Sequence, residues 1–441
     1  MAILAHLPQV LQTVFTTVAD AAGHAAHFTK RPDRAKFTAA TWVQTTVLGW
    51  LAHPDATLDQ LCQLASRLGV EVSPQALDQR FDERSAACLE QVLHHAMTQV
   101  VAADPVAVPL LQRFAAVVVQ DATTITLPND FAARWPSCGG RTTTTPTSAL
   151  KCGVQLDLLS GALRPVALAS GRTQDQALAF APQPFAPGTL RIADLGFFNF
   201  DSFAALSAQG CYWLSRVRVN TTLTDADGHR WQVLAFVQQH LAAGGEATVH
   251  LGRIGLPGRL LVAPVPQEVA DQRRRRMQQD ARDKGQAVSA AALALASWTI
   301  VMTNVPAAQL SITEALVLLR ARWQIELLFK LWKSHGRIDQ WRSQKPWRIL
   351  CEVYAKLLAM LIQHWLLLVG CWTYPDRSLV KASRTIQAYA GELASALGQM
   401  PQLEQVLRSI QRCLQHHARL NPRRKHPNTY QLLLTVPDGY R

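Results

Sequence analysis

Three carboxylates occupy positions from which they could bind metal ions. Asp121 and Asp194 each directly follow a short apolar run, 115–120 and 189–193, that predicts a β-strand. A buried strand ends where its sheet meets solvent, so a carboxylate there is held by rigid backbone and stays accessible. For either aspartate alone, an ordinary turn at the end of a strand is the simpler interpretation.

The third carboxylate, Glu326, lies in a segment whose charged residues recur at helical intervals. Four of them are spaced by four, four and three positions: Arg322, Glu326, Lys330 and Lys333. A helix places such residues on one face. An exposed salt-bridge stripe is the alternative, and such stripes contribute little stability. Because the rest of the segment is strongly apolar, one carboxylate among cations favours a site that holds metal and phosphate together.

Carboxylates and cations in this combination suit the cleavage of phosphodiester bonds. The reaction needs an activated water or 3′-hydroxyl and charge stabilisation on the leaving oxygen, which two Mg²⁺ ions about 3.5–4 Å apart supply. Mg²⁺ prefers hard oxygen ligands, and Mn²⁺ is expected to substitute for it. Arginine and lysine side chains would hold the phosphates.

The elements that must position these residues can be read from the apolar pattern. Residues 1–100 are predicted to be helical, and Ser73-Pro74 predicts a helix that starts at Pro74. The segment 57–81 has the length of a helix-turn-helix or of an ordinary helical hairpin. Strands are predicted from residue 115 onward, with a hairpin of 149–159 and 162–170 around Ser160-Gly161. Further strand-like segments are 211–219, 231–236, 247–252, 260–265 and 298–303. The chain is predicted to be helical again from Ile312 almost to Pro422.

The net charge of +13 favours a polyanionic partner, either nucleic acid or an anionic membrane surface. Residues 1–110 carry seven Lys/Arg against ten Asp/Glu, or −3, which leaves 37 against 21, or +16, for residues 111–441. Part of this excess is the run Arg273–Arg276, on a predicted helix that would follow a DNA backbone or form a solvated face. Eight cysteines without a paired spacing indicate reduced thiols in a cytosolic protein. The most apolar stretch, 349–372, contains charged residues and is predicted to be a buried helix rather than a membrane span.

The combined pattern resembles the DDE transposases of the insertion-sequence-four family. The family signature is Tyr-x₂-Arg-x₃-Glu-x₆-Lys, and Arg322, Glu326 and Lys333 match it in spacing, while Leu319 replaces the tyrosine. The other matching features are Asp121, Asp194 followed by Gly196-Phe197-Phe198, and the strand 212–216. The resemblance covers about residues 30 to 370.

The resemblance implies an α/β fold: a ribonuclease-H-like catalytic core with a β-rich insertion, preceded by a helical N-terminal domain and followed by C-terminal helices. The expected boundaries are 1–105 for the helical domain, 106–218 and 304–372 for the two parts of the core, 219–303 for the insertion and 373–441 for the C-terminal region. The N-terminal domain would bind DNA ends, and the C-terminal region would serve dimerisation.

The resemblance also implies residue roles. Asp121, Asp194 and Glu326 would be both catalytic residues and metal ligands. The expected DNA-binding residues are Arg216, Trp298, Arg322, Lys330 and Lys333. In related enzymes a tryptophan at the place of Trp298 stacks on a flipped base, although a core aromatic at the start of a strand is an equal alternative here. The phosphate contact of the signature tyrosine is in doubt at Leu319.

The function implied is cut-and-paste transposition: metal-dependent cleavage of double-stranded DNA at terminal inverted repeats and strand transfer to target DNA. A homodimer in the synaptic complex and a bacterial, cytoplasmic, nucleoid-associated location would follow. Two alternatives remain, a nuclease on the same core that cuts without joining and an inactive DNA-binding regulator derived from a transposase.

Overall fold

The computed structural model describes residues 2–29, 35–138, 147–180, 184–283, 285–423, 425 and 427–435. The chain divides into two compact units, each built from separate stretches of sequence. The first unit comprises Met1–Ala107, Asp121–Gln183 and Gln324–His426. The second comprises Val108–Gln120, Pro184–Trp323 and Pro427–Arg441. The fold is mixed α/β, as predicted, and the predicted five-part division of the chain stays a prediction.

The first unit is mainly helical. Its N-terminal helices are α1 (Ala2–Thr13), a π-helical stretch (Val14–Val18), α2 (Ala19–Ala25), α3 (Ala39–Ala52), α4 (Leu58–Arg67), α5 (Pro74–Asp78) and α6 (Glu83–Thr98). Its later helices are α13 (Trp323–Ser334), α14 (Pro346–Leu368), α15 (Leu379–Ala396) and α16 (Met400–His417). Thr57 and Gln60 form a capping box at the start of α4, and Ser73 caps α5, which begins at Pro74 as predicted.

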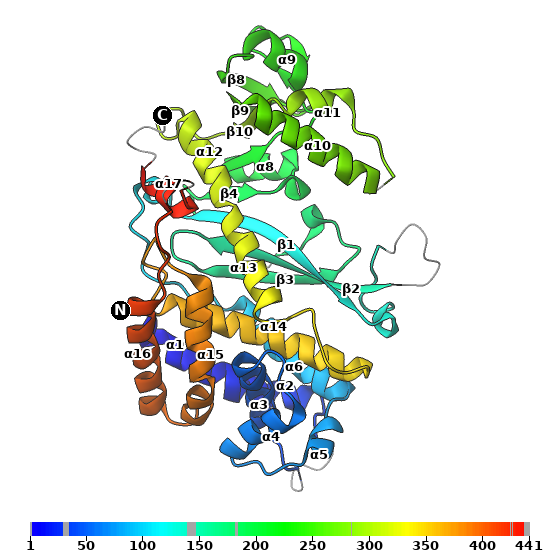
Figure 1. The fold of residues 1–441 in the computed structure, drawn as a ribbon, viewed down its shortest axis with the longest axis vertical. Helices are drawn as coiled ribbons and strands as arrows, with labels where there is room; N and C mark the ends of the chain where they lie inside the picture. The colour runs from blue at the N-terminus through cyan, green and yellow to red at the C-terminus, as the bar shows by residue number, and fades with distance from the viewer. Residues whose placement is uncertain are drawn as a thin grey trace. The chain divides into compact units, whose positions relative to one another are not determined.

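Helix α14 forms the centre of this unit. Helices α3, α6 and α15 pack against it, which Figure 1 shows in blue and orange around the gold helix. In the described part of the chain, α14 is the helix long and apolar enough to cross a membrane, and all of its most apolar window is buried inside the protein. Its apolar character therefore reflects a position in the core, as predicted for 349–372.

The strands of the first unit are the later part of β1 (Val117–Leu127), then β2 (Ser148–Asp157) and β3 (Leu163–Ser170), in the order β3-β2-β1. β2 and β3 pair antiparallel, which confirms the predicted hairpin. Gly161 in its turn has φ of +74°, and a β-carbon there would lie 2.4 Å from the indole of Trp372. Only glycine fits both requirements, the backbone angle and the close approach.

The second unit continues from the first residues of β1 in the order β1-β4-β5-β10-β9-β8-β6-β7. Its strands are β4 (Leu190–Ala193), β5 (Tyr212–Arg216), β6 (Thr222–Thr224), β7 (Arg230–Gln232), β8 (Gly245–Leu251), β9 (Leu256–Pro264) and β10 (Trp298–Thr303). β4 is parallel to β1 and to β5, and β10 pairs antiparallel with β5 and β9. The helices are α7 (Pro109–Gln112), α8 (Phe200–Ala208), α9 (Val233–His240), α10 (Gln267–Asp283), α11 (Ala290–Leu295), α12 (Ile312–Ala321) and α17 (Thr429–Thr435).

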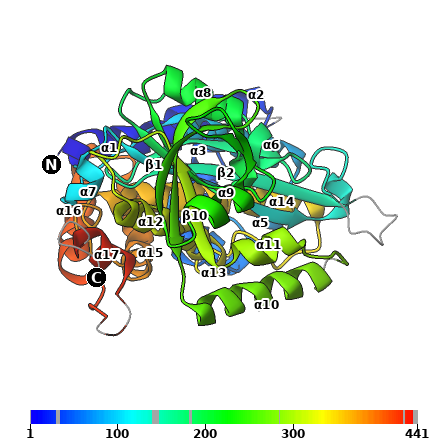
Figure 2. The ribbon, with the colours of Figure 1, turned by 90° about the horizontal axis from the view of Figure 1, so that it is seen from above.

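Aromatic and aliphatic residues from several strands and helices form the core of the second unit. Trp213 of β5 is fully buried and stacks on Phe203 of α8, with ring centroids 4.8 Å apart. Helix α10 lies at the periphery, which Figure 2 shows, and its single buried residue among those described is Ala270. The predicted helix around Arg273–Arg276 is thereby confirmed.

Two predicted boundaries are wrong. β1 does not end before Asp121 but continues to Leu127, and its later residues alternate between buried and exposed. The segment 231–236 is not a strand throughout, because α9 begins at Val233. Its buried residues, Val233, Phe236 and Val237, follow helical spacing.

Candidate active site

Asp121 lies within β1, at the point where the pairing of this strand with β4 stops. The last paired residues of the parallel ladder are Gln120 and Ala193. Asp121 is half-buried, and its Oδ1 accepts a hydrogen bond of 2.8 Å from the backbone N–H of Ala122. The side chain is thus held by its own strand, although the strand continues beyond it.

Asp194 directly follows β4, as predicted. It is half-buried and occupies the N-cap position of a 3₁₀ turn, Leu195–Phe197, where its carbonyl accepts the N–H of Phe197 at 3.0 Å. Asp194 and Asp121 are therefore the residues that follow Ala193 and Gln120, the last pair of two adjacent parallel strands.

A buried arginine that the sequence analysis did not single out supports these strand ends. Arg191 of β4 is 6% exposed, and its Nε donates to Oε1 of Gln120 at 2.9 Å. Its Nη1 also donates to the hydroxyl of Ser202 on α8 at 3.3 Å. Burial lowers the pKa of Arg191 to about 10, so the side chain stays charged at neutral pH. The sequence signal for Arg191 was a charged residue inside a predicted apolar strand, three positions before Asp194.

Arg218 is a second residue that the sequence analysis missed. Its Nη2 donates to the carbonyl of Leu195 at 2.9 Å, and its guanidinium lies 4.9 Å from the centre of the Phe198 ring. It therefore fixes the turn that follows Asp194. Arg218 lies two residues after Arg216 in the predicted strand 211–219, and alternate residues of a strand share a face, which was the signal.

Helix α13 presents Glu326 half-buried and Lys330 exposed, while Lys333 is half-buried. The opposite side of the helix is packed into the protein through Ile325, Leu328, Phe329, Leu331 and Trp332. Nζ of Lys333 donates to the backbone carbonyl of Thr124 on β1 at 3.0 Å, so α13 lies beside the later part of β1 within the first unit.

The remaining predicted residues lie in the second unit. Arg322 is half-buried in the junction between α12 and α13, and Leu319 is buried on α12 with 8% exposure. Arg216 is exposed at the end of β5. Trp298 begins β10, and its indole N–H donates to the carbonyl of Ala242 at 3.0 Å. The indole of Trp298 has a hydrogen-bond partner within the protein and packs on the apolar core, which fits the alternative of a core aromatic. Base stacking by Trp298 stays a prediction.

The predicted site residues are thus divided between the units. The first unit contains Asp121, Glu326, Lys330 and Lys333, and the second contains Asp194, Arg216, Trp298 and Arg322. Within each unit they lie on rigid elements or at their ends: β1 and α13 in the first, and β4, β5, β10 and the α12–α13 junction in the second.

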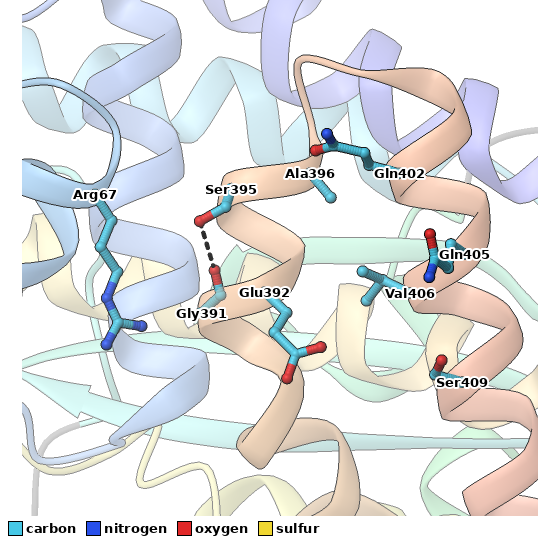
Figure 3. A pocket seen from close by; sticks show the side chains of 9 residues that line it. All are labelled: Arg67, Gly391, Glu392, Ser395, Ala396, Gln402, Gln405, Val406 and Ser409. Atoms are coloured by element: carbon cyan, nitrogen blue, oxygen red, sulfur yellow. Dashed lines mark hydrogen bonds between the residues drawn. The ribbon is translucent and has the colours of Figure 1, made fainter.

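Two other features of the described residues could be mistaken for the site. A pocket of about 580 Å³ lies beside α15 and α16, lined by Arg67 and polar side chains such as Gln405 and Ser409 (Figure 3), and it contains none of the predicted residues. Asp225, Asp227 and His229 have ligand atoms within 4.8 Å of one another. Asp225 Oδ1 already accepts the backbone N–H groups of Asp227 and His229, which explains this group as a turn.

Comparison with known proteins identifies the family. The sequence profile described as "Transposase DDE domain" matches residues 112–362, more than half of the chain. The chain therefore belongs to the DDE transposases, enzymes that act on DNA and depend on divalent metal ions. This finding confirms the predicted membership in this family.

Several curated relatives are similar over most of their length. The transposase for insertion sequence element IS231B of Bacillus thuringiensis subsp. berliner is 26% identical over 342 residues, which cover 72% of this chain and 71% of the relative. The transposase for IS231F of Bacillus thuringiensis subsp. israelensis is also 26% identical, with the same coverage. The transposase for IS1151 of Clostridium perfringens is 26% identical over 68% of each chain.

Proposed function

We propose that this protein catalyses cut-and-paste transposition of an insertion sequence. It would cleave double-stranded DNA at the terminal inverted repeats of the element and join the 3′-hydroxyls to target DNA. The relatives are named as transposases for insertion sequence elements, which supports an element of this kind as the substrate.

Asp121, Asp194 and Glu326 are the proposed metal ligands. They offer only carboxylate oxygens, which suits Mg²⁺, with Mn²⁺ as a substitute. Two bound ions would activate the attacking hydroxyl and stabilise the leaving oxygen.

The observation that carries this proposal is the hydrogen bond from Lys333 to Thr124. From that contact, Asp121 lies three residues back along β1, about 10 Å in an extended strand. Glu326 lies seven residues back along α13, about 10.5 Å in a helix. Spans of similar length from one contact bring Asp121 and Glu326 to a shared site where β1 and α13 run in the same direction away from that contact.

The strand order supports a ribonuclease-H-like core. β3-β2-β1 is followed by β4 and β5, with β4 parallel to β1 and to β5, and the later strands extend from β5 through β10. Strands β6 to β9 all lie between Asp194 and Glu326 in sequence, which suits the proposed insertion at 219–303. Helices α1 to α6 and α15 to α17 would be the N-terminal and C-terminal regions.

Four cations are proposed to hold phosphates near the scissile bond: Arg216, Arg322, Lys330 and Lys333. Lys330 and Arg216 are exposed, so a phosphate can reach their charged groups. Because two element ends must be joined, the acting form would be a homodimer.

The test is incubation of the purified protein with its own flanking genomic ends, a target plasmid and Mg²⁺. Cleavage at the ends followed by joined products is expected. Cleavage without joining would favour the nuclease alternative, whereas binding of the ends without cleavage would favour the inactive regulator.

A further inference from the structure

The connection between α13 and α14, together with the first turn of α14, carries four basic side chains paired with only two carboxylates. We call this set the basic connection: Arg337, Arg342, Lys345 and Arg348. Its two acidic partners are Asp55 and Asp78, which come from the N-terminal helices of the same unit. The set directly follows the helix that carries Glu326 and Lys333.

Asp55, in the turn between α3 and α4, pairs with two arginines at once. One of its oxygens lies 3.1 Å from Nη1 of Arg337 and 3.6 Å from Nη2 of Arg342. All three side chains are between 44% and 56% exposed. A single solvated carboxylate therefore neutralises half of the charge that faces it.

Asp78, the last residue of α5, repeats the arrangement. It pairs with Lys345 and, at 2.7 Å, with Nη1 of Arg348. The hydrogen bond from Lys345, reinforced by the charge of Arg348, lowers the pKa of Asp78, so this carboxylate is charged at neutral pH. Lys345 is nevertheless 68% exposed. In these pairs two acids face four cations, and with Asp339 of the same connection counted, the local excess is one positive charge.

The backbone under these side chains is fixed from inside the protein. Nζ of Lys356 donates to the carbonyl oxygens of Arg337, at 3.2 Å, and Gln340, at 2.7 Å. Lys356 is 2% exposed and pairs with the buried Glu352 at 2.7 Å. A charged lysine is rarely buried unless it is paired in this way.

Arg337 adds a strained backbone to this arrangement. Its φ of +48° lies in the left-handed region that residues other than glycine seldom adopt. Strain of this kind persists where the surroundings over-determine it, and it is concentrated at functional sites. The buried Lys356 supplies the restraint, and Arg337, Arg342 and Lys345 are exposed on this fixed support.

We propose that the basic connection is a surface that binds DNA phosphates, and that Asp55 and Asp78 occupy its cations until DNA replaces them. This proposal rests on the DNA-acting function above. Exposed ion pairs are weak, so Arg337, Arg342 and Lys345 can leave their carboxylates for phosphates at little cost. Arg348 is only 15% exposed and stays paired with Asp78. Arginine presents a planar fork of donors that matches a phosphate as well as a carboxylate. The two acids therefore act as internal competitors of DNA.

Because Asp55 and Asp78 compete with DNA for the same cations, substitutions of the acids and substitutions of the cations should change DNA affinity in opposite directions. Asp55→Asn frees Arg337 and Arg342, and Asp78→Asn frees Lys345, so both should tighten binding of DNA. Arg342→Gln and Lys345→Gln should weaken it. Each phosphate contact changes the log–log salt slope of DNA binding by about 0.9. Between 1 M and 0.1 M salt, that slope corresponds to a roughly eightfold gain in affinity. We expect each acid variant to tighten binding by roughly three- to tenfold at 0.1 M salt and to steepen the slope by about 0.9.

The experiment measures equilibrium binding of the full-length protein to a fluorescent 30-base-pair duplex of arbitrary sequence, without divalent metal, at several salt concentrations. Glu404→Gln is the matched control, because Glu404 and Arg408 form an exposed pair of 3.0 Å on α16 and the substitution changes the net charge equally. The affinity of Glu404→Gln for the duplex should differ from that of the wild type by less than twofold. Circular dichroism and thermal melting establish that each variant is folded.

The outcomes separate this inference from the proposed function. If the wild type does not bind the duplex, the function fails. If the wild type binds while Asp55→Asn and Asp78→Asn bind no better than Glu404→Gln, the basic connection is a structural ion-pair set and the inference is overturned. Loss of affinity in the acid variants, with folding intact, would overturn it as well.

Discussion

Lys333 on α13 and Thr124 on β1 are joined by a hydrogen bond of 3.0 Å from the lysine Nζ to the threonine backbone carbonyl. The bond connects the helix that carries Glu326 with the strand that carries Asp121. Since the acceptor is a backbone oxygen, the contact does not depend on the identity of residue 124. It leaves the ammonium group further N–H donors that can reach a phosphate.

Lys333→Met should separate these two roles. Loss of the bond to Thr124 should lower the free energy of unfolding by about 1 kcal/mol. Loss of a charged donor to phosphate should reduce cleavage by roughly ten- to a hundredfold. Urea denaturation and a cleavage assay on element ends measure the two effects. Lys333→Arg, which keeps the charge, should retain part of the activity. A Met variant that is destabilised but cuts at the wild-type rate would limit Lys333 to a structural role.

Arg191→Met should destabilise the second unit. Removal of the guanidinium breaks its hydrogen bond of 2.9 Å to the buried Gln120, and loss of a hydrogen bond to a charged group costs about 1.5–3 kcal/mol. Arg191→Lys should recover only part of this loss, because an ammonium cannot reproduce the fork that bridges Gln120 and Ser202. Chemical denaturation of the three proteins tests this. Equal stability of all of them would show that the pair does not support the strand ends.

His364 should make the stability of the protein depend on pH. It is fully buried, Nε2 lies 2.7 Å from the carbonyl oxygen of Gly161, and burial lowers its pKa from 6.5 to about 4. The unfolded chain therefore binds a proton between pH 6.5 and 4 that the folded protein does not. Stability is fully present above pH 6.5 and falls as the pH drops through this window, by about 3 kcal/mol in total.

The comparison for His364 is His364→Gln, which retains an N–H donor for Gly161 but does not titrate. Its stability should be lower than that of the wild type at pH 7 and should change less between pH 6.5 and 4. Thermal unfolding at intervals of half a pH unit measures both curves. Parallel curves would assign the acid sensitivity to other groups.

Much of the helical framework could be predicted because its signals are local. Ser73-Pro74 gave the start of α5, and Ser160-Gly161 gave the turn between β2 and β3. The end of β1 could not be predicted. Aspartate is disfavoured in strands, so the sequence pattern places the end of the strand before Asp121. The sheet position of β1, between β2 and β4, overrides that local preference. The helix α9 was missed because a short apolar run has no decisive period.

The candidate site was only partly accessible from the sequence. Glu326 and Lys333 could be recognised from their spacing on one helix. Arg191 and Arg218 lie close in sequence to Asp194 and Arg216, but their roles could not be predicted. Those roles depend on partners distant in sequence, Gln120 and Leu195. The run Arg273–Arg276 shows the same limit. Arg273 donates to the carbonyl of Trp298 at 3.1 Å and Arg274 to that of Leu293 at 3.1 Å, while Arg275 and Arg276 are exposed.

The most direct test of the central claim is Mg²⁺-dependent cleavage of end-containing DNA by Glu326→Gln, measured beside a gel shift on the same preparation. The substitution keeps the volume and helix propensity of the side chain and removes the charge that would hold a metal ion. Glu392→Gln, an exposed glutamate on α15, is the control. The account predicts that Glu326→Gln binds the ends normally and is folded, but cuts at least about a thousandfold more slowly. Cutting at a rate near that of the wild type would remove Glu326 from the metal site and contradict the proposed arrangement of the three acids.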